Sequence, residues 1–430
     1  MTTLAPAPGS GEKSAPRTRR DQTFHWLLSA SSVSMLGSHM TAIAYPMVVL
    51  LLTDSPLVAG WAAFAAIAPS ILVYMPAGAL IDRWDPGRVM LISELGRGGA
   101  IAIVACAIAL RKPYLTPLIV TAIIIAAIIE GILEVASTLA QRRYVGALVE
   151  RKQIPSALAR LEGGTHAVLV AGRPLGGLLF GIEPIFPFLA DVCTFIYSAG
   201  VLIGIRKNRR AVEKAGIGSS LLPRPRLRSD IRRGLGWLRR DQFAWMTMVA
   251  FSTGTLIFQA LIMVFLADAR AQRLPALGIG MVLAASGVGG IFGSAAASRL
   301  LKRVGYSWIK IQAVTWIVGF AALAASAGRH FFLMAVVMAI LGLTGALGNI
   351  ELNVYLMQNV RQGMLARVTS VNRLAVLSAC AVGPALGGIL VQELRVQNAL
   401  IVLAVMTIPL VVLSLIRSAT GVSRNQVATR

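Results

Sequence analysis

Long apolar stretches recur along the whole chain, separated by short polar segments. A helix that crosses a bilayer needs about 20 mostly apolar residues. The pattern predicts such helices at 24–52, 57–81, 88–110, 115–139, 163–182, 186–205, 242–266, 277–300, 308–327, 331–357, 367–392 and 396–417. Helices satisfy their own backbone hydrogen bonds inside lipid. The predicted fold class is therefore an all-α integral membrane protein with twelve transmembrane helices.

A basic polar segment near the midpoint interrupts this pattern. Within residues 206–240, Ile231, Leu235 and Leu238 recur at helical spacing between arginines. This is a basic amphipathic helix, which we expect to lie on the inner membrane surface. The predicted division of the chain is a disordered tail (1–22), an N-terminal six-helix bundle (23–205), the basic linker (206–240), a C-terminal six-helix bundle (241–417) and a second tail (418–430).

The two bundles look like copies of one unit. The motif GRPLGG at 172–177 in the fifth predicted helix recurs as GPALGG at 383–388 in the eleventh. Parallel repeats of this kind build transporters whose binding site lies at the midplane, between the halves. We therefore expect two six-helix bundles related by a pseudo-two-fold axis.

The basic residues are distributed unevenly between the two sides of the membrane. If the N-terminus is cytoplasmic, only six of the 41 Lys and Arg residues fall in outer loops, namely Arg111, Lys112, Arg270, Arg273, Arg329 and Arg395. This positive-inside bias places both termini in the cytoplasm, in a multi-pass protein of a bacterial inner membrane. The net charge of +23 then implies contact with anionic lipid headgroups of the bilayer and not with nucleic acid.

Enzyme and cofactor motifs are not recognisable in the sequence. Cys106, Cys193 and Cys380 fall in separate predicted helices, without disulfide or metal spacing. Gly289 and Gly293 lie inside an apolar helix, where they predict a small-residue packing face and not a dinucleotide-binding turn. We therefore predict no cofactor, no metal and no catalytic residue.

The loop between the second and third predicted helices carries the most specific motif. It reads GALIDRWDPGR over residues 78–88. This pattern resembles the signature loop of the major facilitator superfamily. The resemblance implies a conformational latch that holds one access state, formed here by Gly78, Asp82, Arg83 and Arg88.

Several further segments resemble the macrolide and enterobactin exporter branch of that superfamily. They are SMLG at 34–37, LTDSP at 52–56, ELGR at 94–97 and GILE at 131–134. The chain departs from the branch at two places. Ser38 and His39 stand where the branch often has an Asp, and Arg173 separates a glycine from a proline in the fifth helix.

Ionisable residues within predicted spans are costly and indicate candidate functional sites. Glu130 and Glu134 lie one turn apart on one face of the fourth predicted helix. Arg173 in the fifth predicted helix lies at about the same depth as Glu130, since each residue adds about 1.5 Å of rise. We expect a Glu130–Arg173 pair, which is either a substrate or proton site or a structural ion pair.

Other polar residues within the spans are weaker candidates. His39 titrates near pH 6.5 when unperturbed, so it is either a proton site or a packing histidine. Glu351 and Asn349 in the tenth predicted helix either line a cavity or pack, and Gln259 is weaker still. Residues placed near helix ends are interpreted differently: Asp191 and His166 as wetted or capping groups, and Glu94 and Arg97 as members of the latch network.

These features, with the resemblance, predict a secondary active transporter. It would act as a monomer and export a small organic molecule, such as an antibiotic, a siderophore or another secondary metabolite, in exchange for protons. One alternative is the same fold carrying a lysophospholipid or taking up a nutrient. Two further alternatives are a sensor that docks a partner through the basic linker and a membrane-embedded enzyme.

Overall fold

The computed structural model describes residues 15–81, 84–110, 113–148, 168, 171–173, 175–209, 227–304, 308–325 and 331–419. Apart from the 3-10 turn η1 (Pro113–Leu115), the elements within these ranges are α-helices. The first bundle contains α1 (Ala15–Thr53), α2 (Pro56–Ile81), α3 (Pro86–Ala109), α4 (Thr116–Leu148) and α6 (Phe186–Arg209). Part of a further helix lies between α4 and α6, at 171–173 and 175–182, and is called helix five below.

The second bundle follows the short helix α7 (Leu227–Arg240). It contains α8 (Gln242–Ala271), α9 (Ala276–Val304), α10 (Trp308–Ala325), α11 (Phe331–Asn359), α12 (Gln362–Glu393) and α13 (Val396–Ala419). Within the described ranges, nine helices are long and apolar enough to cross a membrane, and α10 and α13 contribute two shorter apolar segments. With helix five, these account for the twelve predicted spans, so the fold class is confirmed.

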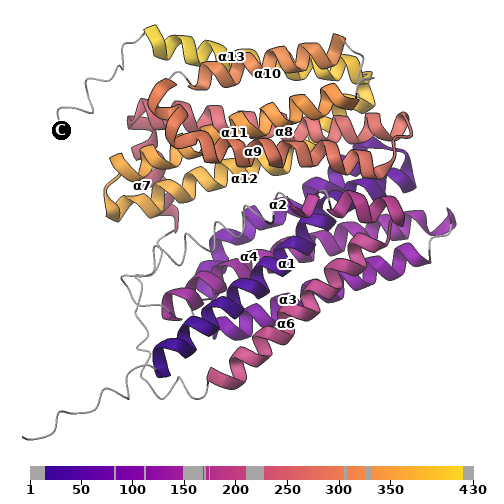
Figure 1. Ribbon diagram of the computed structural model, residues 1–430, viewed down its shortest axis with the longest axis vertical. Coiled ribbons are helices and arrows are strands. Elements are labelled where there is room, and N and C mark those ends of the chain that lie inside the picture. The colour runs from indigo at the N-terminus through magenta and orange to yellow at the C-terminus, as the bar shows by residue number, and fades with distance from the viewer. Residues whose placement is uncertain are drawn as a thin grey trace, which may run out of the picture.

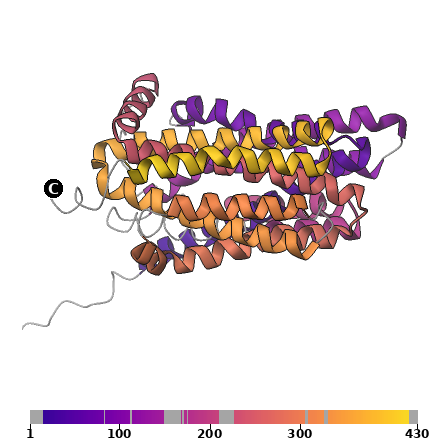
Figure 2. The same ribbon diagram turned by 90° about the horizontal axis from the view of Figure 1, so that it is seen from above.

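The two bundles lie side by side and converge at one end (Figure 1). The helices of the first bundle, indigo to magenta, and those of the second, orange to yellow, meet where α1 joins α2 and spread apart toward the end where α7 lies. The view turned by 90° shows the long helices running along a common direction (Figure 2).

Equivalent glycine contacts relate the two bundles by pseudo-symmetry. A Cβ atom added to Gly172 of helix five would lie 2.5 Å from the Cβ atom of His39 on α1, and one added to Gly383 of α12 would lie 2.5 Å from the Cβ atom of Gln259 on α8. One turn further on, Gly176 lies against α1 and Gly387 lies against α8 in the same way. The repeated motifs therefore pack their helices on corresponding partners, as expected for the two halves of a pseudo-two-fold fold.

The bundles make close backbone contact at the end where they converge. A Cβ atom on Gly60 of α2 would lie 2.6 Å from the Pro384 carbonyl oxygen of α12, and one on Gly388 would lie 2.5 Å from the Pro56 carbonyl oxygen. Only glycine permits such an approach of two helices without displacing backbone atoms. We call this end, with the α1–α2 connection and the end of α8, the closed end.

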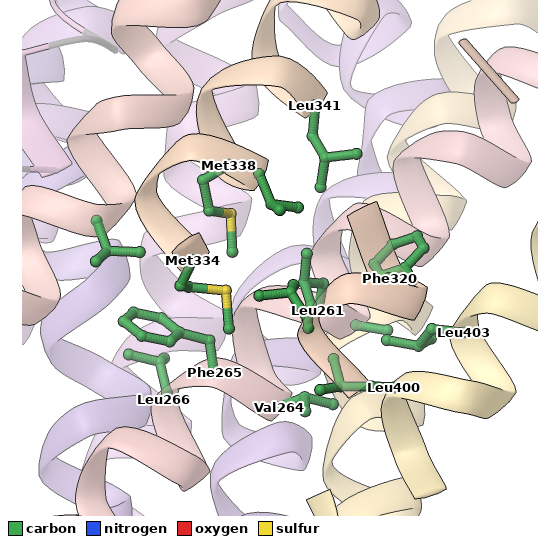
Figure 3. Close-up of a cluster of buried hydrophobic side chains, with 14 of the residues drawn as sticks. Leu261, Val264, Phe265, Leu266, Phe320, Met334, Met338, Leu341, Leu400 and Leu403 are labelled. Carbon is green, nitrogen blue, oxygen red and sulfur yellow. The ribbon is translucent and has the colours of Figure 1, made fainter. Parts of the chain in front are cut away.

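An apolar core holds the second bundle together around α8. Met334 and Met338 of α11 and Phe320 of α10 point toward Leu261 of α8 (Figure 3). Leu400 and Leu403 of α13 complete the cluster on the same side as Phe320 (Figure 3). In α9, Gly289 and Gly293 lie against the backbone of α11, which confirms the predicted small-residue packing face.

Two local predictions require correction. The helix α1 begins at Ala15, inside the segment 1–22 that was expected to be disordered. The amphipathic α7 forms as expected, but its Leu238 is fully buried against α8, α11 and α12, and Gly234 lies against the Arg367 backbone. Its apolar face therefore packs on protein and not on the lipid surface, because the first turns of α8 and α12 offer an apolar partner.

Candidate functional site

A buried ion pair lies in the middle of the first bundle. Arg97 of α3 places its Nη2 atom 3.4 Å from Oε1 of Glu130 on α4. The second carboxylate oxygen of Glu130 accepts a 3.0 Å hydrogen bond from the Tyr45 hydroxyl of α1. The guanidinium carbon of Arg97 stands 4.7 Å from the ring centre of Phe195 on α6, in cation–π geometry. Four helices thus meet around this one arginine.

A second carboxyl, that of Glu94, lies one turn before Arg97 on α3. Its Oε1 atom is 4.0 Å from Arg97 Nη1. Ser34 of α1 donates a 2.7 Å hydrogen bond to Glu94, and Ser137 of α4 donates one of 3.2 Å. Arg97 also donates a 2.6 Å hydrogen bond to the hydroxyl of Ser38. Glu94 is therefore bonded to two other helices of the bundle, α1 and α4.

A third carboxyl comes from α6. Asp191 is fully buried and accepts hydrogen bonds from the hydroxyls of Thr41 on α1, at 2.8 Å, and Thr194, at 3.1 Å. It also interacts electrostatically with Arg97. A Cβ atom at Gly37 of α1 would overlap the Asp191 and Thr194 side chains, so this glycine is what lets α6 bring a carboxyl against α1. We call Arg97, Glu94, Glu130 and Asp191 the charge cluster.

One face of α1 contacts every member of the charge cluster. The side chains involved recur at intervals of four, three and four residues, which places them along a single helical stripe. They are all hydroxyl groups: Ser34, Ser38, Thr41 and Tyr45. Each bonds a different charged residue of α3, α4 or α6, so α1 contacts every ionisable group of the cluster through one stripe.

Arg173 is not part of the charge cluster. Glu130 pairs with Arg97, whereas Arg173, its expected partner, makes no ion pair with any residue that the structure describes. The helix five glycine Gly172 packs on His39, and both Arg173 and Arg97 lie within electrostatic range of that imidazole. Glu134, one turn beyond Glu130, is exposed. The place of Arg173 in the sequence indicates its depth, but depth alone does not fix the direction in which a helix presents a side chain.

The candidates of the second bundle lie apart from the charge cluster. Glu351 is buried on α11, and Asn349 accepts a 2.7 Å hydrogen bond from the side chain of Asn353 on the same helix. Gln259 of α8 holds the position that corresponds to His39. The structure therefore separates the candidate residues into the charge cluster of the first bundle and, in the second bundle, one buried carboxyl with several side-chain amides.

The loop motif is only partly described. Asp82 and Arg83 lie outside the described residues, and so do the side chains of α2 around Gly78. His166, interpreted as a wetted or capping group, also lies outside them. Arg88 is exposed on the first turn of α3, which Asp85 caps by accepting a 3.3 Å hydrogen bond from the Gly87 amide. The latch therefore stays a prediction.

Of the interpretations of polar residues near helix ends, that of Asp191 was wrong. Glu94 and Arg97 are buried members of the charge cluster, and their membership of the latch network stays a prediction because Asp82 and Arg83 lie outside the described residues. Asp191 is fully buried instead of wetted. A signal for Arg97 was present, since it stands as far from the inner end of the predicted span 88–110 as Glu130 does from the end of 115–139. The sequence offered no comparable signal for Asp191, which contacts α1 only because Gly37 leaves room.

A chain of twelve apolar helices in two pseudo-symmetric bundles defines a multi-pass membrane transporter. The profile of the Major Facilitator Superfamily matches residues 27–384. The chain belongs to this superfamily and is a secondary transporter with a small-molecule substrate.

Solved structures of the same fold are distant in sequence. A bacterial homologue of the iron transporter ferroportin, in its inward-facing state, superposes with a TM-score of 0.71 at 17% identity, covering 92% of this chain and 98% of that one. A bacterial ferroportin homologue in the outward-facing state superposes with a TM-score of 0.59 at 17% identity, covering 92% of this chain and 99% of that one. The nucleoside transporter NupG superposes with a TM-score of 0.68 at 14% identity, covering 94% of this chain and 100% of that one. No curated protein sequence matches the chain.

Proposed function

We propose that this transporter exports a small organic molecule in exchange for protons, by alternating access. The observation that carries the proposal is the charge cluster, in which three buried carboxyls surround one arginine. A buried charge without a counter-ion costs several kcal/mol. One guanidinium balances one carboxylate, so the remaining carboxyls of the cluster are suited to holding and releasing protons.

Protonation would act on α1. A carboxylate accepts hydrogen bonds at both oxygens, whereas a protonated carboxyl is also a donor. Adding a proton to Glu130 or Asp191 would therefore change the bonds from Tyr45 or Thr41. On another face, α1 packs Ile43 and Met47 into the apolar core of the second bundle. A change at the charge cluster can in this way reach the contact between the bundles.

The conformation supports a state in which cargo is loaded from the cytoplasm. The bundles are in contact at the closed end, and the fold superposes better on the inward-facing than on the outward-facing ferroportin homologue. The positive-inside bias assigns the closed end to the outer side of the inner membrane, with both termini in the cytoplasm. An exporter would bind its cargo in this state.

The direction and the cargo class are proposed from the resemblance to the macrolide and enterobactin exporter branch. We expect an antibiotic, a siderophore or another secondary metabolite. The latch of Gly78, Asp82, Arg83 and Arg88 would stabilise one access state. These assignments are tested together with proton coupling in a single assay.

The experiment measures accumulation of antibiotics, siderophores and amphipathic dyes in cells that express the wild type, Glu130→Gln or Glu393→Gln, each with and without an uncoupler. Glu393 is exposed at the end of α12 and serves as the control. We expect lower accumulation with the wild type and the control, and loss of this difference with uncoupler or Glu130→Gln. Export that resists both would contradict proton coupling. Accumulation raised by the wild type would contradict export and favour nutrient uptake.

A further inference from the structure

Arg173 of helix five is a cation between the two bundles that has no anionic partner among the residues that the structure describes. Among the described residues it forms neither an ion pair nor a hydrogen bond, and it is only half-buried. Arg97 is different, because its charge is offset by the carboxyls of the charge cluster. The guanidinium of Arg173 thus carries a charge that no described residue around it neutralises.

The surroundings of Arg173 come from both bundles. Its neighbour Gly172 packs on His39 of α1, which lies within electrostatic range of Arg173. From the other bundle, the thiol of Cys380 on α12 also interacts electrostatically with Arg173. The guanidinium therefore stands where the first bundle faces the second, which is where transporters built from repeats bind cargo.

The pseudo-symmetry of the fold shows that this charge is not needed for packing. Gly172 and Gly383 make equivalent contacts with α1 and α8, yet the next residue is Arg173 in one bundle and Pro384 in the other. The same helix–helix contact thus forms without a charge in the second bundle. A cation near the middle of a membrane span costs free energy, and within the described part of the chain no ion pair offsets that cost.

We propose that Arg173 binds an anionic group of the transported molecule, a carboxylate, sulfonate or phosphate. The planar guanidinium can bind such a group through two parallel hydrogen bonds. His39, which lies within electrostatic range of Arg173, would supply a further hydrogen bond from its imidazole N–H. Binding an anion would neutralise this charge. Part of the affinity for cargo would then come from Coulombic attraction, which offsets the free-energy cost of holding the guanidinium away from water. This assigns an organic anion as the cargo and rests on the proposed function.

The first test measures the sign of the electric potential at the site without any knowledge of the cargo. In a Cys106→Ala/Cys193→Ala background, Cys380 is the reporter. The protein, purified and in nanodiscs, reacts separately with the anionic 2-sulfonatoethyl and the cationic 2-(trimethylammonium)ethyl methanethiosulfonate. We expect the anionic reagent to be favoured, and Arg173→Gln to lower the ratio of the two rates by about tenfold. Arg173→Lys keeps the charge and should keep the ratio.

A ratio that is unchanged by Arg173→Gln would overturn the proposal. Thermal unfolding of both variants checks that they are folded, and a second reporter, His39→Cys, repeats the measurement from α1. If neither reporter reacts with either reagent, the site is sealed from water and the proposal is also overturned.

The second test uses protection of Cys380 by matched compounds. The probes are 1-naphthoate, its neutral counterpart 1-naphthamide, and lysophosphatidylglycerol. Protection by either anion, but not by the amide, supports the proposal, and the anion that protects distinguishes a metabolite carboxylate from a lipid phosphate. Equal protection by the amide, or none by any probe, contradicts it. Neither test requires a gradient or export, so a failed transport assay and a failed anion site remain distinguishable.

Discussion

Asp54 and Arg270 form an ion pair across the closed end, with 3.2 Å between Oδ1 of Asp54 and Nη2 of Arg270. Asp54 follows α1 in the first bundle, and Arg270 lies in the last turn of α8 in the second. Both side chains are exposed, at 78% and 43% of their full area. An exposed pair of this kind contributes only about 0.2–1 kcal/mol. The pair therefore adjusts the balance between access states and does not lock one of them.

Removing the Asp54 charge should open the closed end slightly. Asp54 has a φ of 49°, and asparagine tolerates this left-handed conformation, so Asp54→Asn removes the charge without straining the backbone. We expect a rise of about 1.4- to 5-fold in the ratio of open to closed molecules, from the free energy of an exposed pair. Pulsed EPR between spin labels at Leu110 and Arg395, both exposed, measures this ratio.

High salt should reproduce the effect in the wild type but not in Asp54→Asn, because exposed charges are screened. The control is Glu393→Gln, which removes an exposed charge from the end of α12. An equal change of the distance distribution in that control would contradict a specific role for Asp54.

A larger effect is expected from a side chain at Gly60. In Gly60→Leu, the added Cβ atom would meet the Pro384 carbonyl oxygen at 2.6 Å, and a helix backbone cannot move aside cheaply. Overpacking of this kind costs about 1–3 kcal/mol, which corresponds to a shift of roughly 5- to 150-fold toward the open form. The same EPR distance reports it. Gly200→Leu is the matched control, because nothing lies within 4 Å of a Cβ atom there.

The charge cluster should respond unequally to loss of its cation and of its anions. Arg97→Met leaves Glu94, Glu130 and Asp191 without a buried counter-ion, and breaking a buried pair in this way costs about 3–5 kcal/mol. Glu130→Gln keeps a hydrogen-bonding group beside Tyr45 and should cost less. Thermal unfolding in detergent measures both. The exposed Glu393→Gln at the end of α12 is the comparison, because Glu393 lies outside the charge cluster, and a loss there equal to that of Arg97→Met would count against the cluster.

The contact between α9 and α11 gives a prediction about folding. A Cβ atom at Gly342 of α11 would overlap the Ser286 carbonyl of α9, whereas nothing lies within 4 Å of one at Gly345. We expect Gly342→Val to lose about 1–3 kcal/mol or more from overpacking, and Gly345→Val to stay close to the wild type. The yield of monodisperse protein and its melting temperature separate the two. Equal behaviour would show that α9 and α11 do not need this approach.

The sequence determined the spans and the repeat more fully than the site. Apolar length locates a spanning helix, and a motif such as GRPLGG is visible without coordinates. The partner of Glu130 was not predictable in the same way. Arg97 and Arg173 both lie at about the membrane depth of Glu130, so depth alone allows either as its partner. The choice between them depends on how α3, α4 and helix five are rotated about their axes. That rotation is set by packing, including the close approach of α6 to Gly37, which no local pattern encodes.

The matching contacts of Gly172 and Gly383 bear on the history of the chain. If the two halves descend from one duplicated ancestor, a contact made by corresponding residues in both halves was already present in that ancestor. Arg173 has no counterpart, since Pro384 occupies the corresponding place. The glycine contact is then the older feature, and the difference between arginine and proline arose afterwards, when the two copies diverged.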